Sequence, residues 1–167
     1  MLVRIEPISK EHAKYSWHLR QNEEVWKYMK CDSPFPSTLE SEEDYYEKMT
    51  HDRWDKMFAI IADEEFVGCV KLKNIGNGAA ELSYYVLRTD IWGRGIGYKA
   101  TMECMKYAFE ELGLDLVYRY VNPKNKGSWS IAMKQKCVRV GISLINPDVE
   151  RLETTKTKWK DILKKSI

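Results

Sequence analysis

A glycine-rich stretch constrains the fold of this chain more than any other feature, because a strand pattern precedes it and a helix pattern follows it. The stretch reads Gly93-Arg94-Gly95-Ile96-Gly97. Residues 80–87 alternate before it, with Leu82, Tyr84 and Val86 on one face of the strand and Glu81, Ser83 and Tyr85 on the other. After it, apolar residues recur at helical spacing: Tyr98, Met102, Met105, Phe109 and Leu112. The order of strand, glycine loop and helix is typical of a sheet that helices cover.

The rest of the chain continues this alternation, and no linker or low-complexity stretch divides it. Further strand patterns cover residues 3–5, 58–62, 66–72, 116–121, 138–144 and 149–157. Helix patterns run from an N-cap at Ser9 through Leu19 toward Tyr28, from a variant capping box at Ser41 and Asp44 through Met49, from Tyr98 to a C-cap at Gly113, and over residues 127–136. Residues 31–38 hold two prolines and are expected to form a loop. The predicted fold is therefore α/β or α+β, with one layer of mixed sheet in a single domain over residues 1–167.

Charge and composition exclude several classes of protein. With 27 basic and 25 acidic side chains, the formal net charge of +2 gives no reason to expect nucleic acid or a membrane surface as a partner. No apolar run approaches the ~20 residues of a spanning helix, and no secretory signal is visible. Cys31, Cys69, Cys104 and Cys137 form no Cys-x-x-Cys pair, and no histidine lies at ligand spacing. We therefore expect a cytoplasmic location, buried cysteines and no metal site.

The glycine stretch carries a chemistry of its own. A loop that enters a helix presents free backbone N–H groups and the positive end of the helix dipole, so we expect it to bind an anion, and phosphate in particular. A dinucleotide fingerprint would need glycine at Tyr98, and a Walker loop would need Gly-Lys followed by Ser or Thr, which is absent. A glycine-rich turn that merely joins strand to helix is the alternative.

At these residues the sequence resembles a known family. Residues 91–98, Ile-Trp-Gly-Arg-Gly-Ile-Gly-Tyr, look like motif A of the GNAT superfamily of acetyl-CoA-dependent N-acetyltransferases, whose last two glycines fall on Gly95 and Gly97. Asn125-Lys126-Gly127-Ser128 resembles the family's Asn-x-x-Ser/Ala segment. Residues 19–25 are similar to the branch that includes ribosomal-protein, polyamine and amino-sugar acetyltransferases. The resemblance implies a twisted, mostly antiparallel sheet with helices on both faces and one splayed parallel strand pair, whose strands end at Leu87 and Val121.

The resemblance also implies where acetyl-CoA binds as a cosubstrate, without a metal. Backbone N–H groups near the end of the first splayed strand would hold the pantetheine, the glycine loop would hold the pyrophosphate, and the later Asn and Ser would contact the pantetheine arm. The expected cofactor-binding residues are Leu87, Thr89, Arg94, Gly95, Gly97, Tyr98, Asn125 and Ser128.

The implied reaction is direct attack of an acceptor amine on the acetyl thioester in a ternary complex. The amine arrives as an ammonium and must lose a proton, and Glu81 on the cleft strand is the candidate general base. An ordinary solvated glutamate is an equal alternative. The expected candidates for the acid that protonates the departing thiolate are Tyr118, Tyr120 and Ser130. The alternative for the tyrosines is a packing role with a hydrogen-bonded hydroxyl. The sequence departs from the family pattern in three places. Ala132 stands where many members have a tyrosine that acts as the general acid. Trp92 stands where the family has Gln or Arg, and Lys136-Cys137 stands where it commonly has Gly-Phe.

The expected acceptor is a small-molecule amine, an amino sugar or a peptide N-terminus. Acidic residues on the second helix would suit a cationic acceptor, although a solvated helix face explains them as well: Glu40, Glu42, Glu43, Asp44 and Glu47. A non-catalytic acyl-CoA-binding or interaction module is the rival hypothesis, and Ala132 keeps it open. The resemblance also allows a homodimer.

Overall fold

The structure, a computed structural model, describes residues 1–29 and 37–164. These residues form one seven-stranded sheet in the order β1-β2-β3-β4-β5-β7-β6. The strands are β1 (Val3–Pro7), β2 (Lys56–Ala62), β3 (Glu65–Gly76), β4 (Ala79–Val86), β5 (Leu116–Val121), β6 (Val138–Ile142) and β7 (Glu150–Thr155). All neighbouring strands of this sheet are antiparallel except β4 and β5, which are parallel. The predicted mixed, mostly antiparallel sheet is confirmed.

The helices of the described chain match the predicted ones only in part. They are α1 (Ala13–Ser16), α2 (Glu23–Trp26), α3 (Leu39–Thr50), α4 (Ile96–Lys106), α5 (Lys126–Lys134) and α6 (Lys156–Lys164). Short 3-10 turns η1 (Lys10–His12), η2 (Leu19–Gln21) and η3 (Thr89–Ile91) lie between them, and α4 continues as a π-helical turn, η4 (Tyr107–Glu111). The continuous helix expected after Ser9 is wrong, because Asn22 is extended and its side chain caps a new helix by accepting from Glu24 N–H.

Two further boundaries correct the sequence-based expectations. The capping box of α3 is formed by Thr38 and Ser41, and not by Ser41 and Asp44, so the helix begins at Leu39. The last strand ends at Thr155, and the following residues form α6, which buries Trp159 and Ile162 against the sheet. The proline loop expected over residues 31–38 lies outside the described residues except for Ser37 and Thr38.

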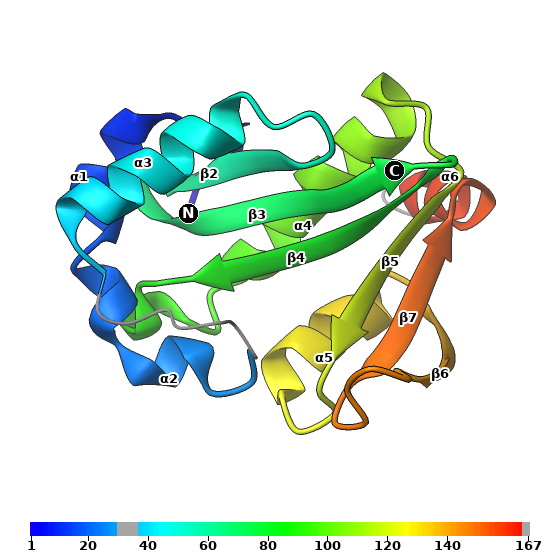
Figure 1. The fold of residues 1–167 in the computed structure, drawn as a ribbon. Coiled ribbons are helices and arrows are strands. Elements are labelled where there is room, and N and C mark those ends of the chain that lie inside the picture. Colours follow the sequence, from blue (N-terminus) through cyan, green and yellow to red (C-terminus); the bar gives the residue numbers. More distant parts are fainter. Residues whose placement is uncertain (30–36, 165–167) are drawn as a thin grey trace.

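Helices cover both faces of the sheet, as Figure 1 shows. On one face α4 and α6 bury apolar residues with Phe58, Ile60, Val70 and Leu82. On the other face α2 and α3 enclose a second apolar cluster, which includes Trp26, Tyr46, Cys69 and Tyr85. Cys104 and Cys137 are buried as well, as expected for cysteines that act as small apolar residues. No helix within the described residues is long and apolar enough to cross a membrane.

The parallel strands β4 and β5 pair over only part of their length. Their backbone partners are Ala79 with Leu116, Ala80 with Val117 and Glu81 with Tyr118. β4 continues to Val86 and β5 to Val121 without further pairing to each other, and the two strands diverge in Figure 1. The sheet therefore opens into a V, narrow at Glu81 and wide toward the glycine loop.

Candidate active site

A cavity of about 640 Å³ occupies this V. Its walls come from β4, the glycine loop, the first turn of α4, β5, α5 and residues 24–29. Of the residues predicted from the sequence, eight line it: Glu81, Gly95, Gly97, Tyr98, Tyr120, Asn125, Ser128 and Ser130. Leu87, Thr89, Arg94 and Tyr118 do not line it. Residues as far apart in sequence as Glu24 and Lys134 thus share one cavity where the strands splay.

The glycine loop presents open backbone donors to the cavity. Gly95 is the N-cap of α4 with φ +82°, a conformation that favours glycine, and no side chain caps the helix. Lys99 N–H bonds to Gly95 C=O. The N–H groups of the turn before it, at Ile96, Gly97 and Tyr98, therefore have no partner within the helix. This turn combines free donors with the positive helix end, the arrangement that binds phosphate.

Gly97 has a second reason to be glycine. A Cβ at this position would lie 2.8 Å from Cε2 of Tyr84 and 3.1 Å from Cδ1 of Ile131. The missing side chain lets the Tyr84 ring and α5 pack directly on the first turn of α4. Glycine at this position therefore also permits close packing between protein segments.

Trp92 connects the loop to β4. Its indole Nε1–H donates to the carbonyl of Val86 over 2.9 Å, and the half-exposed ring lines the cavity. Trp92 stands where the family pattern has Gln or Arg, so the departure gives the loop an anchor to the end of the strand. The sequence alone did not reveal this contact.

The backbone donors of β4 that face the V differ from those expected near Leu87. Leu87 N–H donates to Val67 C=O over 2.7 Å and is buried on the side of β3. Because successive residues of a strand direct their N–H groups to opposite edges, Tyr84 and Val86 direct theirs toward β5. Thr89 accepts from Asn22 Nδ2 at 3.3 Å, which ties it to the cap of α2, and Arg94 is exposed.

Asn125 and Ser128 both have structural partners in the described chain. Asn125 Oδ1 caps α5 by accepting from Ser128 N–H over 3.2 Å. Burial raises the pKa of the Tyr84 hydroxyl, and the neighbouring Ser128 side chain opposes the rise. Ser130 lies two residues further along α5 and is exposed. Tyr84 therefore links β4, α4 and α5. The alternating pattern of the strand predicted which face of the sheet Tyr84 lies on, but not these contacts.

Glu81 lies at the last β4–β5 pair, at the narrow end of the V. Its carboxylate forms an ion pair with Lys73 Nζ at 2.8 Å, and its side chain is 16% exposed. Tyr118, the pairing partner of Glu81, has the Arg151 guanidinium 4.0 Å from its ring centroid, and burial raises its pKa. Tyr120 accepts from Arg151 Nη1 at 3.3 Å. Of these groups, Glu81 and Tyr120 reach the cavity.

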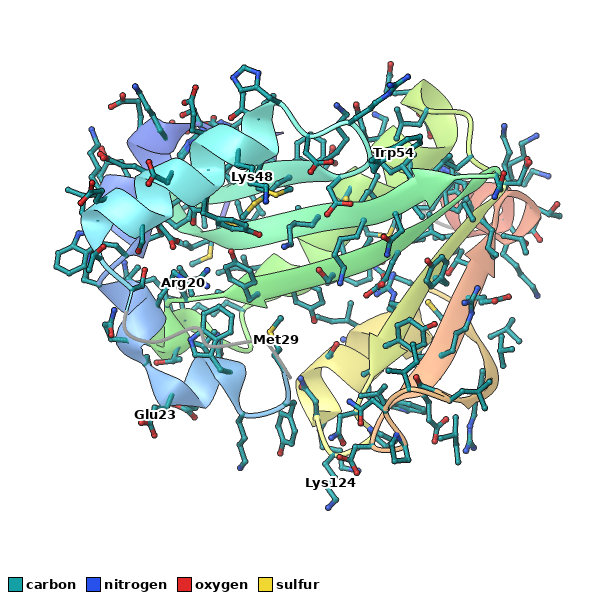
Figure 2. All side chains as sticks on the ribbon, in the orientation of Figure 1. Arg20, Glu23, Met29, Lys48, Trp54 and Lys124 are labelled. Atoms are coloured by element: carbon teal, nitrogen blue, oxygen red, sulfur yellow. The ribbon has the colours of Figure 1, made fainter. Side chains whose placement is uncertain are left out.

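A buried polar network supports the opposite wall of the cavity. Arg20 Nη1 donates to the hydroxyl of Tyr85 over 3.2 Å, and Tyr85 lines the cavity. Arg20 Nε lies 3.2 Å from Glu42 Oε2, and Glu42, which is 3% exposed, also accepts from the Ser16 hydroxyl at 2.8 Å. The Arg20 guanidinium stacks 4.7 Å from the Trp26 ring. Figure 2 shows Arg20 beside the carboxyl end of β4.

This network assigns the acidic residues of α3 to different roles. Glu42 is an internal ion-pair partner, whereas Glu40, Glu43, Asp44 and Glu47 are exposed, and none of the five lines the cavity. Ala132, at the position of the family's tyrosine, is fully buried among Val121, Cys137 and Leu152. Spacing could not reveal the Arg20–Glu42 pair, because its members lie on different elements.

Comparisons with known proteins agree with this architecture. A sequence profile of the acetyltransferase (GNAT) domain family matches residues 3–138. Spermidine N(1)-acetyltransferase of Escherichia coli K12 is 26% identical over 133 residues, which is 79% of this chain and 70% of that protein.

Solved structures show the same fold. Spermidine N-acetyltransferase from Vibrio cholerae, in complex with CoA and spermine, superposes with a TM-score of 0.83 at 19% identity, over 95% of this chain and 98% of that one. A ribosomal-protein alpha-N-acetyltransferase in complex with coenzyme A superposes with a TM-score of 0.81 at 17% identity, over 92% and 93% of the two chains. With the profile match, the splayed strands and the open turn of α4, the chain belongs to the GNAT acetyltransferase family and is an acetyl-CoA-dependent N-acetyltransferase.

Proposed function

We propose that this enzyme acetylates a primary amine of a polyamine such as spermidine, by direct attack of the amine on bound acetyl-CoA. The observation that carries the proposal is the V between β4 and β5. Its wide end has open backbone N–H groups that suit a phosphate, and its narrow end has the carboxylate of Glu81. The spermidine acetyltransferase from Escherichia coli and the spermine-bound structure from Vibrio cholerae support a polyamine as the acceptor.

The residues of the first turn of α4 fit the pyrophosphate of acetyl-CoA. The N–H groups of Ile96, Gly97 and Tyr98 would bind its oxygens, with Arg94 near the outer side of the loop. The N–H groups of Tyr84 and Val86 would donate to the pantetheine arm, which would take the place of a neighbouring strand. These groups are open because β5 does not pair with this part of β4. Asn125 and Ser128 would border the arm from α5.

Glu81 is the proposed general base. A polyamine arrives as an ammonium with a pKa near ~10, and it must lose a proton before its nitrogen can attack. Glu81 already pairs with one ammonium, that of Lys73, which supports its capacity to receive a cationic nitrogen. The cavity also contains groups that attract cations. They are the carboxylate of Glu24 and the aromatic rings of Tyr28, Tyr85 and Tyr120.

Release of the CoA thiol from acetyl-CoA tests the function when it is measured with separate amines: spermidine, spermine, an amino sugar and a peptide with a free N-terminus. The proposal predicts release that depends on spermidine, with acetylspermidine as the product. Turnover of only the sugar or the peptide would contradict the polyamine. Tight CoA binding without turnover of any amine would favour the non-catalytic acyl-CoA module, the alternative that Ala132 supports.

Glu81→Gln tests the base. We expect kcat with spermidine to fall by about 100-fold or more, the size of a general-base contribution. The loss should shrink as the pH rises toward the pKa of the amine, because solvent then supplies the free amine. Glu43→Gln, an exposed carboxylate on α3, is the control. An unchanged kcat in Glu81→Gln would remove Glu81 from the mechanism.

A further inference from the structure

Arg119 is a buried cation at the narrow end of the V. The last β4–β5 backbone pair joins Glu81 to Tyr118, so Arg119 is the first residue of β5 beyond the pairing. Alternation along the strand places its side chain with Val117 and Val121, on the face that α4 and α5 cover. The residue is 3% exposed, yet it lines the cavity.

The charge of Arg119 has little compensation from the described residues. Nη2 donates to the thioether sulfur of Met105 over 3.2 Å, and a thioether is a weak acceptor. Nη1 is buried without a hydrogen-bond partner, and no carboxylate among residues 1–29 and 37–164 pairs with Arg119. A buried cation without a counter-charge is costly, so a group supplied by a ligand is the expected partner.

The positive charge of Arg119 acts on Tyr84, which lines the cavity, and on Cys104 in the core. Burial raises the pKa of Tyr84 and raises that of Cys104 to about 12, and in both cases the Arg119 charge opposes the rise. Two serine hydroxyls also line this side of the cavity, that of Ser128 next to Tyr84 and that of the exposed Ser130, but both are neutral. Nη1 of Arg119 is thus a free donor of a permanent cation at the narrow end.

We propose that Arg119 is a catalytic residue that stabilises the thiolate of CoA when the acetyl group is transferred. This rests on the proposed function, in which the pyrophosphate occupies the wide end of the V and the thioester therefore reaches the narrow end. Glu81 and Arg119 project from opposite faces of the sheet at that end, one toward the incoming amine and one toward the departing sulfur.

The step balances without a further reactant. The amine nitrogen forms a bond to the acetyl carbon, the carbon–sulfur bond breaks, and its electron pair stays on sulfur. Two protons leave the nitrogen: Glu81 receives the ammonium proton before the attack and passes it to solvent, and it then receives the proton that the nitrogen loses once it is bound to the acetyl carbon. Arg119 supplies no proton, because a guanidinium does not act as an acid in proteins, and it holds the thiolate through a charge-assisted N–H···S contact.

Binding of CoA and of desulfo-CoA at different pH values tests this role without turnover. If a cation faces the sulfur, it favours the thiolate, so the preference of the wild-type protein for CoA over desulfo-CoA should grow as the pH rises from 7 to 9. Arg119→Gln should lose about tenfold of that preference at pH 9, which corresponds to a shift of one pKa unit in the bound thiol. Arg119→Lys should keep part of it.

Controls separate this role from a structural one. Arg139→Gln makes the same substitution on β6, outside the cavity, and should keep the wild-type preference. Arg119→Gln should not lower Tm, since it removes an uncompensated buried charge. It should lower kcat about 100-fold with little change in the Kd of acetyl-CoA.

Two results would overturn the role of Arg119: a wild-type CoA preference that does not change with pH, or the same preference in Arg119→Gln as in the wild type. In both cases the proposed function would stand as long as amines are acetylated. Absence of any CoA binding by the wild type would defeat the proposed function as well. If Arg119→Gln does not fold, the wild-type pH dependence and Arg119→Lys still decide the question.

Discussion

The two sides of the cavity are built in different ways. The proposed cofactor wall, residues 95–98 and 125–131, consists of two short segments that each begin a helix, and the first of them supplies open backbone N–H groups. The proposed acceptor wall, residues 24–29 with Tyr85, depends on side chains from separate elements, joined through Arg20 and Glu42. A site that backbone geometry creates can be recognised in a local sequence pattern, whereas one held by long-range side-chain contacts cannot.

The largest expected effect comes from breaking the acceptor wall. Arg20→Met leaves the Glu42 carboxylate buried without its cation and Tyr85 without its donor. Removal of one partner from a buried ion pair costs about 3–5 kcal/mol, so we expect denaturant unfolding to show a loss of roughly 3 kcal/mol. We also expect a higher KM for the amine and an unchanged Kd for acetyl-CoA. A weaker Kd for acetyl-CoA with an unchanged amine KM would contradict the division into two walls.

The cofactor wall is tested by Gly95→Glu. A carboxylate at this N-cap would occupy the place of the phosphate and repel it, so acetyl-CoA affinity measured by calorimetry should fall about 100-fold, or ~2.7 kcal/mol. Gly113→Glu is a matched control, because Gly113 also has a positive φ, of +66°, and open space at its Cβ, but lies at the far end of the helix. Equal affinities in the two variants would contradict the assignment of the loop.

Gly97→Ala tests whether the loop glycines also serve packing. The added methyl would meet the Tyr84 ring at 2.8 Å and Ile131 at 3.1 Å. Overpacking costs about 1–3 kcal/mol, so Tm should fall. Gly95→Ala has open space and should lose only the ~1 kcal/mol of a positive φ. A greater loss of stability in Gly95→Ala than in Gly97→Ala would show that Tyr84 does not pack as described.

The smallest expected effect is a loss of folding stability at high pH, which involves one buried cysteine in the core behind each wall. Burial raises the pKa of Cys69, behind the acceptor wall, to about 11, and that of Cys104, behind the cofactor wall, to about 12. The folded state keeps its thiol protons longer than the unfolded state does. Stability is therefore complete below pH ~9 and falls as the pH rises toward 11 or 12. Cys69→Ala and Cys104→Ala should each flatten the alkaline decline of unfolding free energy, and an unchanged slope would contradict that thiol's burial.

The sequence predicted those parts of the molecule that local rules determine. The strand before the glycine loop and the helix up to Gly113 were predicted because period and turn chemistry act over a few residues, whereas the splayed parallel pair was expected only from the family resemblance. Helix α6 was not predicted at all, since Trp159 and Ile162 stabilise it by contacts with residues that are distant in the sequence. The roles of Tyr84, Arg20 and Arg119 were missed for the same reason: each depends on partners from other elements.

Mass spectrometry of spermidine incubated with acetyl-CoA and either the wild-type protein or Gly95→Glu tests the central claim most directly. The account predicts that the wild type adds one acetyl group to spermidine at a rate that saturates with both substrates. It predicts that Gly95→Glu makes this product only at much higher acetyl-CoA concentrations, with an unchanged KM for spermidine. The absence of acetylspermidine with the wild type, or the same acetyl-CoA dependence in both proteins, would contradict it.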